Sequence, residues 1–92
     1  RGIFWQWIAF LPRADREAVR RQARAEEKRR REAENVEATI AAKETELAEF
    51  AAVMNDPDFY QTHPEPQRLF SLYARLKREV ETLYERLERL SA

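Results

Sequence analysis

Apolar residues recur at alternating steps of three and four positions in two separate parts of the chain, a spacing typical of helices that pair as coiled coils. The first series runs through Ala33, Val36, Ile40, Lys43, Leu47, Phe50 and Met54, in which Lys43 is a polar interruption. The second series runs through Leu69, Tyr73, Leu76, Val80, Leu83, Leu87 and Leu90. The stretch 55–67 between them holds three prolines and two aspartates, which make continuation of a helix costly. The pattern therefore predicts an all-α fold, an antiparallel two-helix coiled-coil hairpin.

No Gly or Pro occurs between 16 and 54, and Asp15 is placed to act as the N-cap of a long helix. We therefore expect an aromatic N-terminal segment or linker over 1–14 and a hairpin over 15–92, with helix one over about 16–54, a turn over 55–65 and helix two over about 66–90.

Two starts of the second helix are open. Pro66 suits the first position of a helix, where its missing N–H costs nothing. Thr62 and Glu65 can instead form a capping box one turn earlier.

The two apolar series pair in one sensible register, with Met54 opposite Leu69 and Ile40 opposite Leu83. Helix two then ends opposite Ala33, so that roughly residues 16–32 of helix one overhang it. On one flank Glu44 faces Glu79, and Lys43 beside them can compensate both carboxylates. The other flanks bring opposite charges together, at Glu46 with Lys77, Glu37 with Arg86 and Glu34 with Arg89.

Charge is segregated along the chain although the formal net charge is zero. Residues 13–31 hold nine basic and four acidic residues, whereas 32–60 hold one basic and eight acidic residues. A helical stripe of cations can follow a phosphate backbone, where guanidinium groups bind bidentately. The candidate nucleic-acid-binding residues are Arg16, Arg20, Arg24, Lys28 and Arg31 as the stripe, widened by Arg21, Arg29 and Arg30. The alternative is a solvated helix face, balanced by Glu17, Glu26, Glu27 and Glu32 in i, i+4 pairs.

Other chemistry is poorly supported. The chain has no Cys and one Gly, so it carries neither a thiolate metal site nor a phosphate-binding P-loop. His63 is the single histidine, and we expect it to be structural or exposed rather than a metal ligand or general base. We expect Asp56 and Asp58 to form the turn. Phe59 and Tyr60 are expected to fold onto its end.

Two rival functions use other residues. A structural or adaptor coiled coil would bind another protein through Phe70, Leu72 and Tyr84. A membrane-surface anchor would place aromatic side chains beside cations, using Trp5, Trp7 and Phe10 with Arg13 and Arg16. The apolar stretch Ile3–Leu11 is far shorter than the roughly 20 residues of a spanning helix, so no transmembrane segment is expected.

The turn and the end of the second helix carry a family resemblance. Asp56-Pro57-Asp58-Phe59-Tyr60 and Tyr84-Glu85-Arg86-Leu87-Glu88 resemble motifs of the C-terminal coiled-coil domain of ABC-F ATP-binding cassette proteins, the Uup-like group. The resemblance covers about 16–90. It departs from the family at Leu87, where Trp is frequent.

The resemblance implies a function that spacing alone does not. It suggests a non-catalytic module of a cytoplasmic ABC-F ATPase, with no cofactor in this chain and with ATP and Mg in the parent protein. Its implied partners are nucleic acid, either DNA or ribosomal RNA, or the ribosome, together with the ATPase domains of the same parent.

Overall fold

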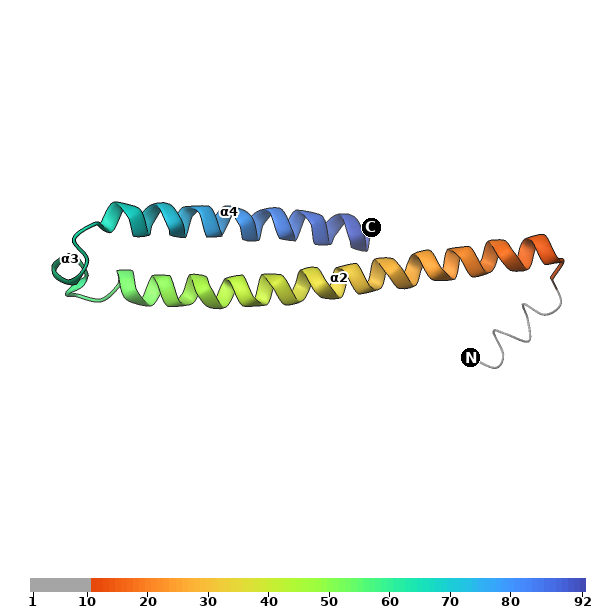
Figure 1. The fold of residues 1–92 in the computed structure, drawn as a ribbon, viewed down its shortest axis with the longest axis horizontal. Helices are drawn as coiled ribbons and strands as arrows, with labels where there is room; N and C mark the ends of the chain where they lie inside the picture. The colour runs from red at the N-terminus through yellow and green to blue at the C-terminus, as the bar shows by residue number, and fades with distance from the viewer. Residues whose placement is uncertain (1–10) are drawn as a thin grey trace. The chain divides into compact units, whose positions relative to one another are not determined.

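The computed structural model describes residues 11–92 of the chain, and all of their regular secondary structure is helical (Figure 1). It contains α2 (Arg13–Met54), α3 (Phe59–Thr62) and α4 (Pro66–Ser91). Residues up to Glu32 form one unit and Ala33–Ala92 form another, and the hairpin of α2 and α4 belongs to the second. The predicted all-α antiparallel hairpin is confirmed.

Helix α2 begins at Arg13, three residues before the start at about 16 that the sequence predicts. The Pro12 carbonyl accepts a hydrogen bond from the Arg16 N–H at 2.9 Å, so helical bonding starts from Pro12. Asp15 consequently lies within the first turn of α2 and is not its N-cap, as the sequence had predicted. Its carboxylate still complements the positive end of the helix dipole.

Helix α4 begins at Pro66, which is one of the two starts that the sequence left open. Pro66 occupies the first turn, where a missing N–H removes no helical hydrogen bond. The capping box does not form: Thr62 ends α3, where its hydroxyl donates to the Asp58 carbonyl at 3.1 Å, and no side chain caps the start of α4. Glu65 precedes the helix without a side-chain capping bond.

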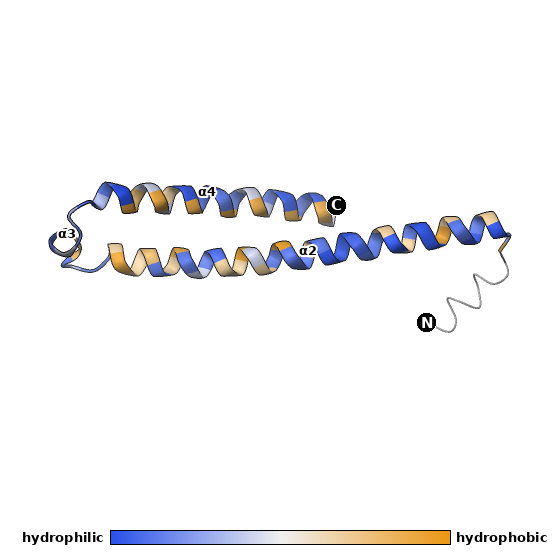
Figure 2. Cartoon of the chain, in the orientation of Figure 1, coloured by the Kyte–Doolittle hydropathy of each residue, from blue (hydrophilic) through white to orange (hydrophobic). Residues whose placement is uncertain are grey.

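The hairpin core is a narrow stripe, because two helices can cover only one face of each other. Its buried side chains are Val36, Ile40, Phe59, Leu76 and Val80. The remaining members of both apolar series are half-buried, Lys43 included, and their neighbours on either side are largely exposed. Hydrophobic positions of α4 accordingly repeat along the side that faces α2 (Figure 2). The paired series of the sequence are therefore the core.

One polar contact fixes the helices in register. Lys43 Nζ donates to Glu79 Oε2 at 2.9 Å, which is the compensation that the pairing predicts. This hydrogen bond, and then the charge of the same ammonium group, holds the pKa of Glu79 below its ordinary value. A polar pair in an apolar seam specifies alignment at some cost in stability.

A second cross-helix bond was not expected from the pairing. The Tyr84 hydroxyl donates to Glu44 Oε2 at 3.0 Å. Side chains lean toward the N-terminus of their own helix, so in an antiparallel pair Tyr84 and Glu44 lean toward each other although their backbones are offset. The predicted ion pairs of Glu46 with Lys77 and of Glu37 with Arg86 do not form among the described residues.

The turn is built around Phe59, which is 1% exposed. The centroid of its ring lies 5.0 Å from that of the His63 ring, on which it stacks. The ring centroids of Tyr60 and Phe70 lie 5.1 Å and 5.8 Å away. As predicted, an aspartate shapes the turn, since the Asp58 N–H donates to Asp56 Oδ1 at 2.8 Å. Tyr60 does not cover the end of the hairpin, because it is 72% exposed.

Replacing Phe59 with Ala should destabilise the hairpin by about 3 kcal/mol, because the ring is the largest fully buried side chain among the described residues. Urea unfolding followed by circular dichroism measures this loss. Tyr60→Ala is the matched control and should change the free energy of unfolding by less than about 0.5 kcal/mol. Equal losses for both variants would show that burial of Phe59 does not anchor the turn.

Candidate nucleic-acid interface

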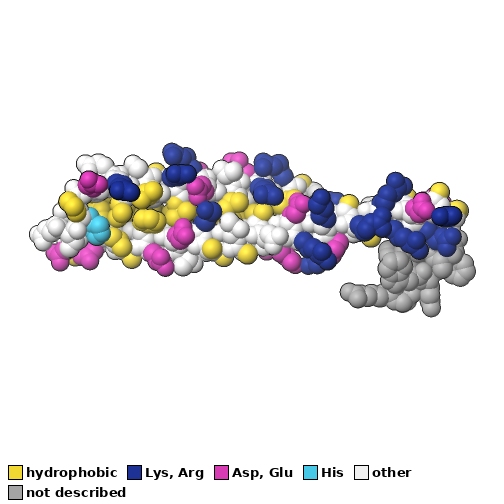
Figure 3. All heavy atoms as spheres, in the orientation of Figure 1, with side chains coloured by type: hydrophobic (Ala, Val, Ile, Leu, Met, Phe, Trp, Pro, Cys, Tyr) yellow, Lys and Arg dark blue, Asp and Glu magenta, His cyan; other side chains and the backbone are white. Residues whose placement is uncertain are grey.

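The first unit of the chain presents its cations to solvent. Every residue from 20 to 31 is exposed, whereas Arg16 is half-buried. Lys and Arg side chains gather over this part of α2 (Figure 3). The helix there has Ala, Arg, Lys, Glu and Gln at nearly every position, so its local propensity is high although no apolar face is covered.

The eight candidate residues do not form one surface. Arg20, Arg24, Lys28 and Arg31 line a single shallow hollow, together with Ala23 and Glu27. This is the predicted stripe, since steps of four and three keep side chains on one face of a helix.

Of the three residues predicted to widen the stripe, Arg21 lines a neighbouring hollow together with Arg20, Arg24 and Glu17, so it lies beside the stripe. At about 100° per residue, Arg30 projects roughly a quarter turn to the other side of Arg20. Arg29 lies about half a turn away from Arg20 and thus on the opposite face. Gln22, the one amide near the cluster, also lies on the far side, so no amide accompanies the stripe for reading bases.

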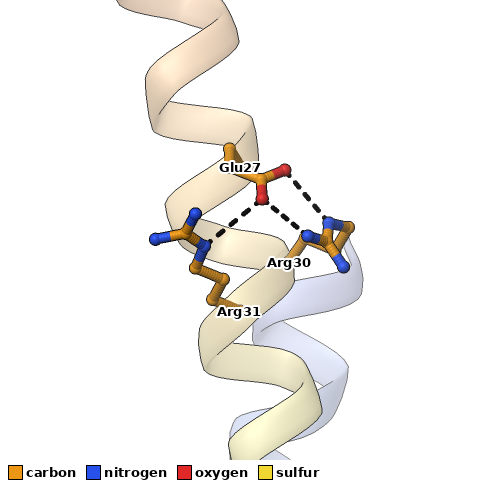
Figure 4. A network of polar contacts seen from close by, with 3 residues as sticks. All are labelled: Glu27, Arg30 and Arg31. Atoms are coloured by element: carbon orange, nitrogen blue, oxygen red, sulfur yellow. Dashed lines mark hydrogen bonds and ion pairs between the residues drawn. The ribbon is translucent and has the colours of Figure 1, made fainter.

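Glu27 lies within the stripe and holds one of its cations, Arg31, together with the neighbouring Arg30 (Figure 4). Arg30 Nη2 donates to Glu27 Oε1 at 2.6 Å and Arg30 Nε donates to Oε2 at 3.1 Å. Arg31 Nε donates to Oε1 at 3.3 Å. The hydrogen bond from Arg30 is the main cause that lowers the pKa of Glu27 below 4.5, with Arg31 adding to it. Part of the expected intrahelical neutralisation is therefore present.

Of the other acids predicted to balance these cations, Glu26 and Glu32 form no ion pair within residues 11–92. Glu17 contacts Arg13, with Oε1 at 3.4 Å from Nε. Within residues 11–92, no ion pair engages Arg20, Arg21, Arg24, Lys28 or Arg29. These five cations keep their full charge for an external anion.

Only some of the residues named for the two rival functions lie in the described part of the chain. Phe70, Leu72 and Tyr84 are 42%, 42% and 44% exposed. Trp5, Trp7 and Phe10 lie outside the described residues. No helix within 11–92 is long and apolar enough to cross a membrane.

His63 takes part in the turn rather than in a polar cluster. Its Nδ1 lies 3.0 Å from Thr62 Oγ1 and 3.3 Å from the Phe59 carbonyl. Among residues 11–92, no group of three His, Cys, Asp or Glu side chains is placed to hold a metal ion.

The described residues comprise a two-helix hairpin and a basic helical stretch. The family model described as ABC transporter C-terminal domain matches residues 24–92, which is 69 of the 92 residues. The chain therefore belongs to the ABC transporter C-terminal domain family, and it is an accessory domain of an ABC protein. No curated protein and no solved structure matches the chain. The family that the turn motif indicated is confirmed.

The pKa of Glu27 should rise toward 4.5 when Arg30 and Arg31 are both replaced with Gln, because those guanidinium groups stabilise the carboxylate. A carbon-detected NMR titration of the glutamate side chains measures this shift. Since the native pKa is lowered, the ion pairs contribute above the ordinary carboxyl pKa and are lost as pH falls through the lowered value. Lys28→Gln is the control and should move the Glu27 midpoint less; an equal shift would contradict the specific contacts.

Proposed function

We propose that this domain binds nucleic acid, DNA or ribosomal RNA, through phosphate contacts of the basic stretch of α2. The observation that supports this most is the set of exposed cations on residues 20–31 that have no acidic partner among the described residues. A helix without a covered apolar face gains nothing from packing, and its sequence instead concentrates permanent positive charge. Such a surface suits a polyanion.

The arrangement favours binding that is independent of base sequence. The stripe Arg16, Arg20, Arg24, Lys28 and Arg31 advances about 6 Å for each step of four residues, so its side chains can meet several phosphates in turn. With Arg31 held by Glu27, four neutralised phosphates correspond to a slope of about −3.6 in log affinity against log salt concentration. Affinity would then fall by roughly 150-fold between about 50 and 200 mM salt.

The parent protein is proposed from the family and from the turn motif. An accessory domain of an ABC protein that binds polynucleotide fits an ABC-F-type ATPase of the Uup-like group acting in the cytoplasm, on DNA or on the ribosome. In that protein, ATP and Mg would bind to the ATPase domains, which would be intramolecular partners of this module. The hairpin would contribute binding and positioning.

Reversing three charges of the stripe, Arg20→Glu with Arg24→Glu and Lys28→Glu, should weaken polynucleotide binding by roughly 100-fold or more at low salt. Fluorescence anisotropy with a labelled DNA duplex and a labelled ribosomal RNA fragment measures the affinity. A triple variant that binds as tightly as the wild type excludes the stripe.

The matched control for this experiment reverses three exposed cations of α4, namely Arg68, Lys77 and Arg78. It changes the net charge by the same amount, so a general electrostatic effect would weaken binding equally. We expect a much smaller loss, together with unchanged helicity in both triple variants.

Glu27 should limit the affinity of this surface. Glu27→Gln releases Arg31, whose ion-pair partner among the described residues is Glu27, and removes a negative charge from the centre of the stripe. We expect binding to strengthen by roughly fivefold and the salt slope to steepen by about 1.

Glu26→Gln is the comparison variant for Glu27→Gln. It changes the net charge identically, but Glu26 forms no ion pair within the part of the chain that the structure describes. We expect it to strengthen binding less than Glu27→Gln does. Equal gains would show that only overall charge matters and that the contacts of Glu27 do not limit binding.

A further inference from the structure

A mainly apolar groove lies on the hairpin next to the turn. Its apolar walls are Phe50, Val53 and Leu69, with His63 at one end and Glu46 and Glu49 along one side. The groove encloses about 500 Å³, enough for one or two large side chains. Hydrophobic side chains lie beside the single histidine near the turn in Figure 3, and both acidic and basic side chains lie around them.

The groove exists because the core of the hairpin is narrow. Val53 flanks the apolar stripe and remains 38% exposed, and Phe50 is half-buried within it. His63 stacks on the fully buried Phe59, so one end of the groove is held by a rigid aromatic contact. The walls are therefore preformed, and a ligand there would displace only water.

The groove is lined by two carboxylates, those of Glu46 and Glu49, and by no Lys or Arg. Residues 44–65 include six acidic residues and no Lys or Arg, whereas α4 places Arg75 beside Glu46 in a neighbouring hollow. Elsewhere on the hairpin Glu79 is paired with Lys43 and Glu44 accepts a hydrogen bond from Tyr84. Glu46 and Glu49, by contrast, form no ion pair with any residue in the range 11–92. Two carboxylates therefore border an apolar floor without a cation of their own.

We infer that this groove binds a basic amphipathic segment of a partner protein. An apolar side chain of the segment would occupy the space between Phe50, Val53 and Leu69, and adjacent Lys or Arg side chains would pair with Glu46 and Glu49. An amphipathic helix laid into an apolar groove is a common mode of peptide recognition, and charge on the rim selects the partner. A polynucleotide is disfavoured here because the carboxylates repel phosphate.

A designed peptide tests this inference with the full chain. The probe is an acetylated, amidated 14-residue helix that carries Leu at steps of three and four and Lys on the flanks of the Leu stripe. Its counterpart has Glu in place of every Lys. Titration of ¹⁵N-labelled protein should show saturable shifts at Glu46, Val53, His63 and Leu69 with the Lys peptide only.

Two double variants decide whether the rim carboxylates matter. Glu46→Gln with Glu49→Gln should weaken binding of the Lys peptide by about tenfold. Glu81→Gln with Glu85→Gln removes two exposed carboxylates from α4 and should leave the affinity within about twofold. Circular dichroism checks that each variant keeps its helicity.

Several results would overturn the inference. These are equal binding of the Lys and Glu peptides, equal losses in the two double variants, shifts centred away from the groove, or no shift up to about 1 mM peptide. Sedimentation of the free protein tests a second copy as the occupant. A dimer that Val53→Asp dissociates would assign the groove to self-association and would also contradict the proposal.

Discussion

The constraint on which the structure depends is that two helices can bury only one stripe each. Five buried side chains make up the core of the described residues: Phe59 of the turn and four members of the apolar series. The remaining members of the series are partly open to water. A core this narrow buries too little apolar surface to stabilise the fold by itself. It depends instead on alignment, which the Lys43–Glu79 contact fixes, and on the turn, which Phe59 fills.

The same constraint separates the chemistry of the chain. Where α2 has a partner helix, its sequence alternates apolar and polar positions, and the polar positions are largely acidic. In residues 20–31 no side chain is covered, and the positions that would continue the apolar series are Gln22, Glu26 and Arg29. The cation stripe lies about half a turn away from these positions. Packing and charge therefore occupy different stretches of the sequence.

The sequence predicted the fold well because the heptad spacing is a direct readout of helix geometry. Every residue of the two apolar series is buried or half-buried, and Pro66 begins α4. The sequence predicted contacts less well where they depend on the direction in which a side chain points. The Tyr84–Glu44 bond follows from the lean of side chains, which a flat pairing diagram omits. Phe59 and Tyr60 are neighbouring aromatic residues of similar size, and the path of the turn decides that Phe59 is buried and Tyr60 exposed.

At the candidate site, too, the sequence predicted the helical face of the cations but not their side-chain contacts. The stripe of cations was evident from its spacing, and the opposite placement of Arg29 follows from counting turns of the helix. That Glu27 engages Arg30 and Arg31, while Glu26 engages neither, depends on rotamers that the sequence does not specify. The groove beside His63 could not be found from sequence, because its walls come from α2, the turn and α4 together.

Because residues 20–31 are exposed, this stretch of α2 can unfold locally. With no tertiary burial there, the helical hydrogen bonds of this stretch depend on propensity and on local pairs such as those of Glu27, so they can break without disrupting the hairpin core. A bound anion that screens the repulsion among neighbouring cations would therefore tighten the helix that holds it. The anion binding that we propose and the local helix order would then form a single coupled equilibrium.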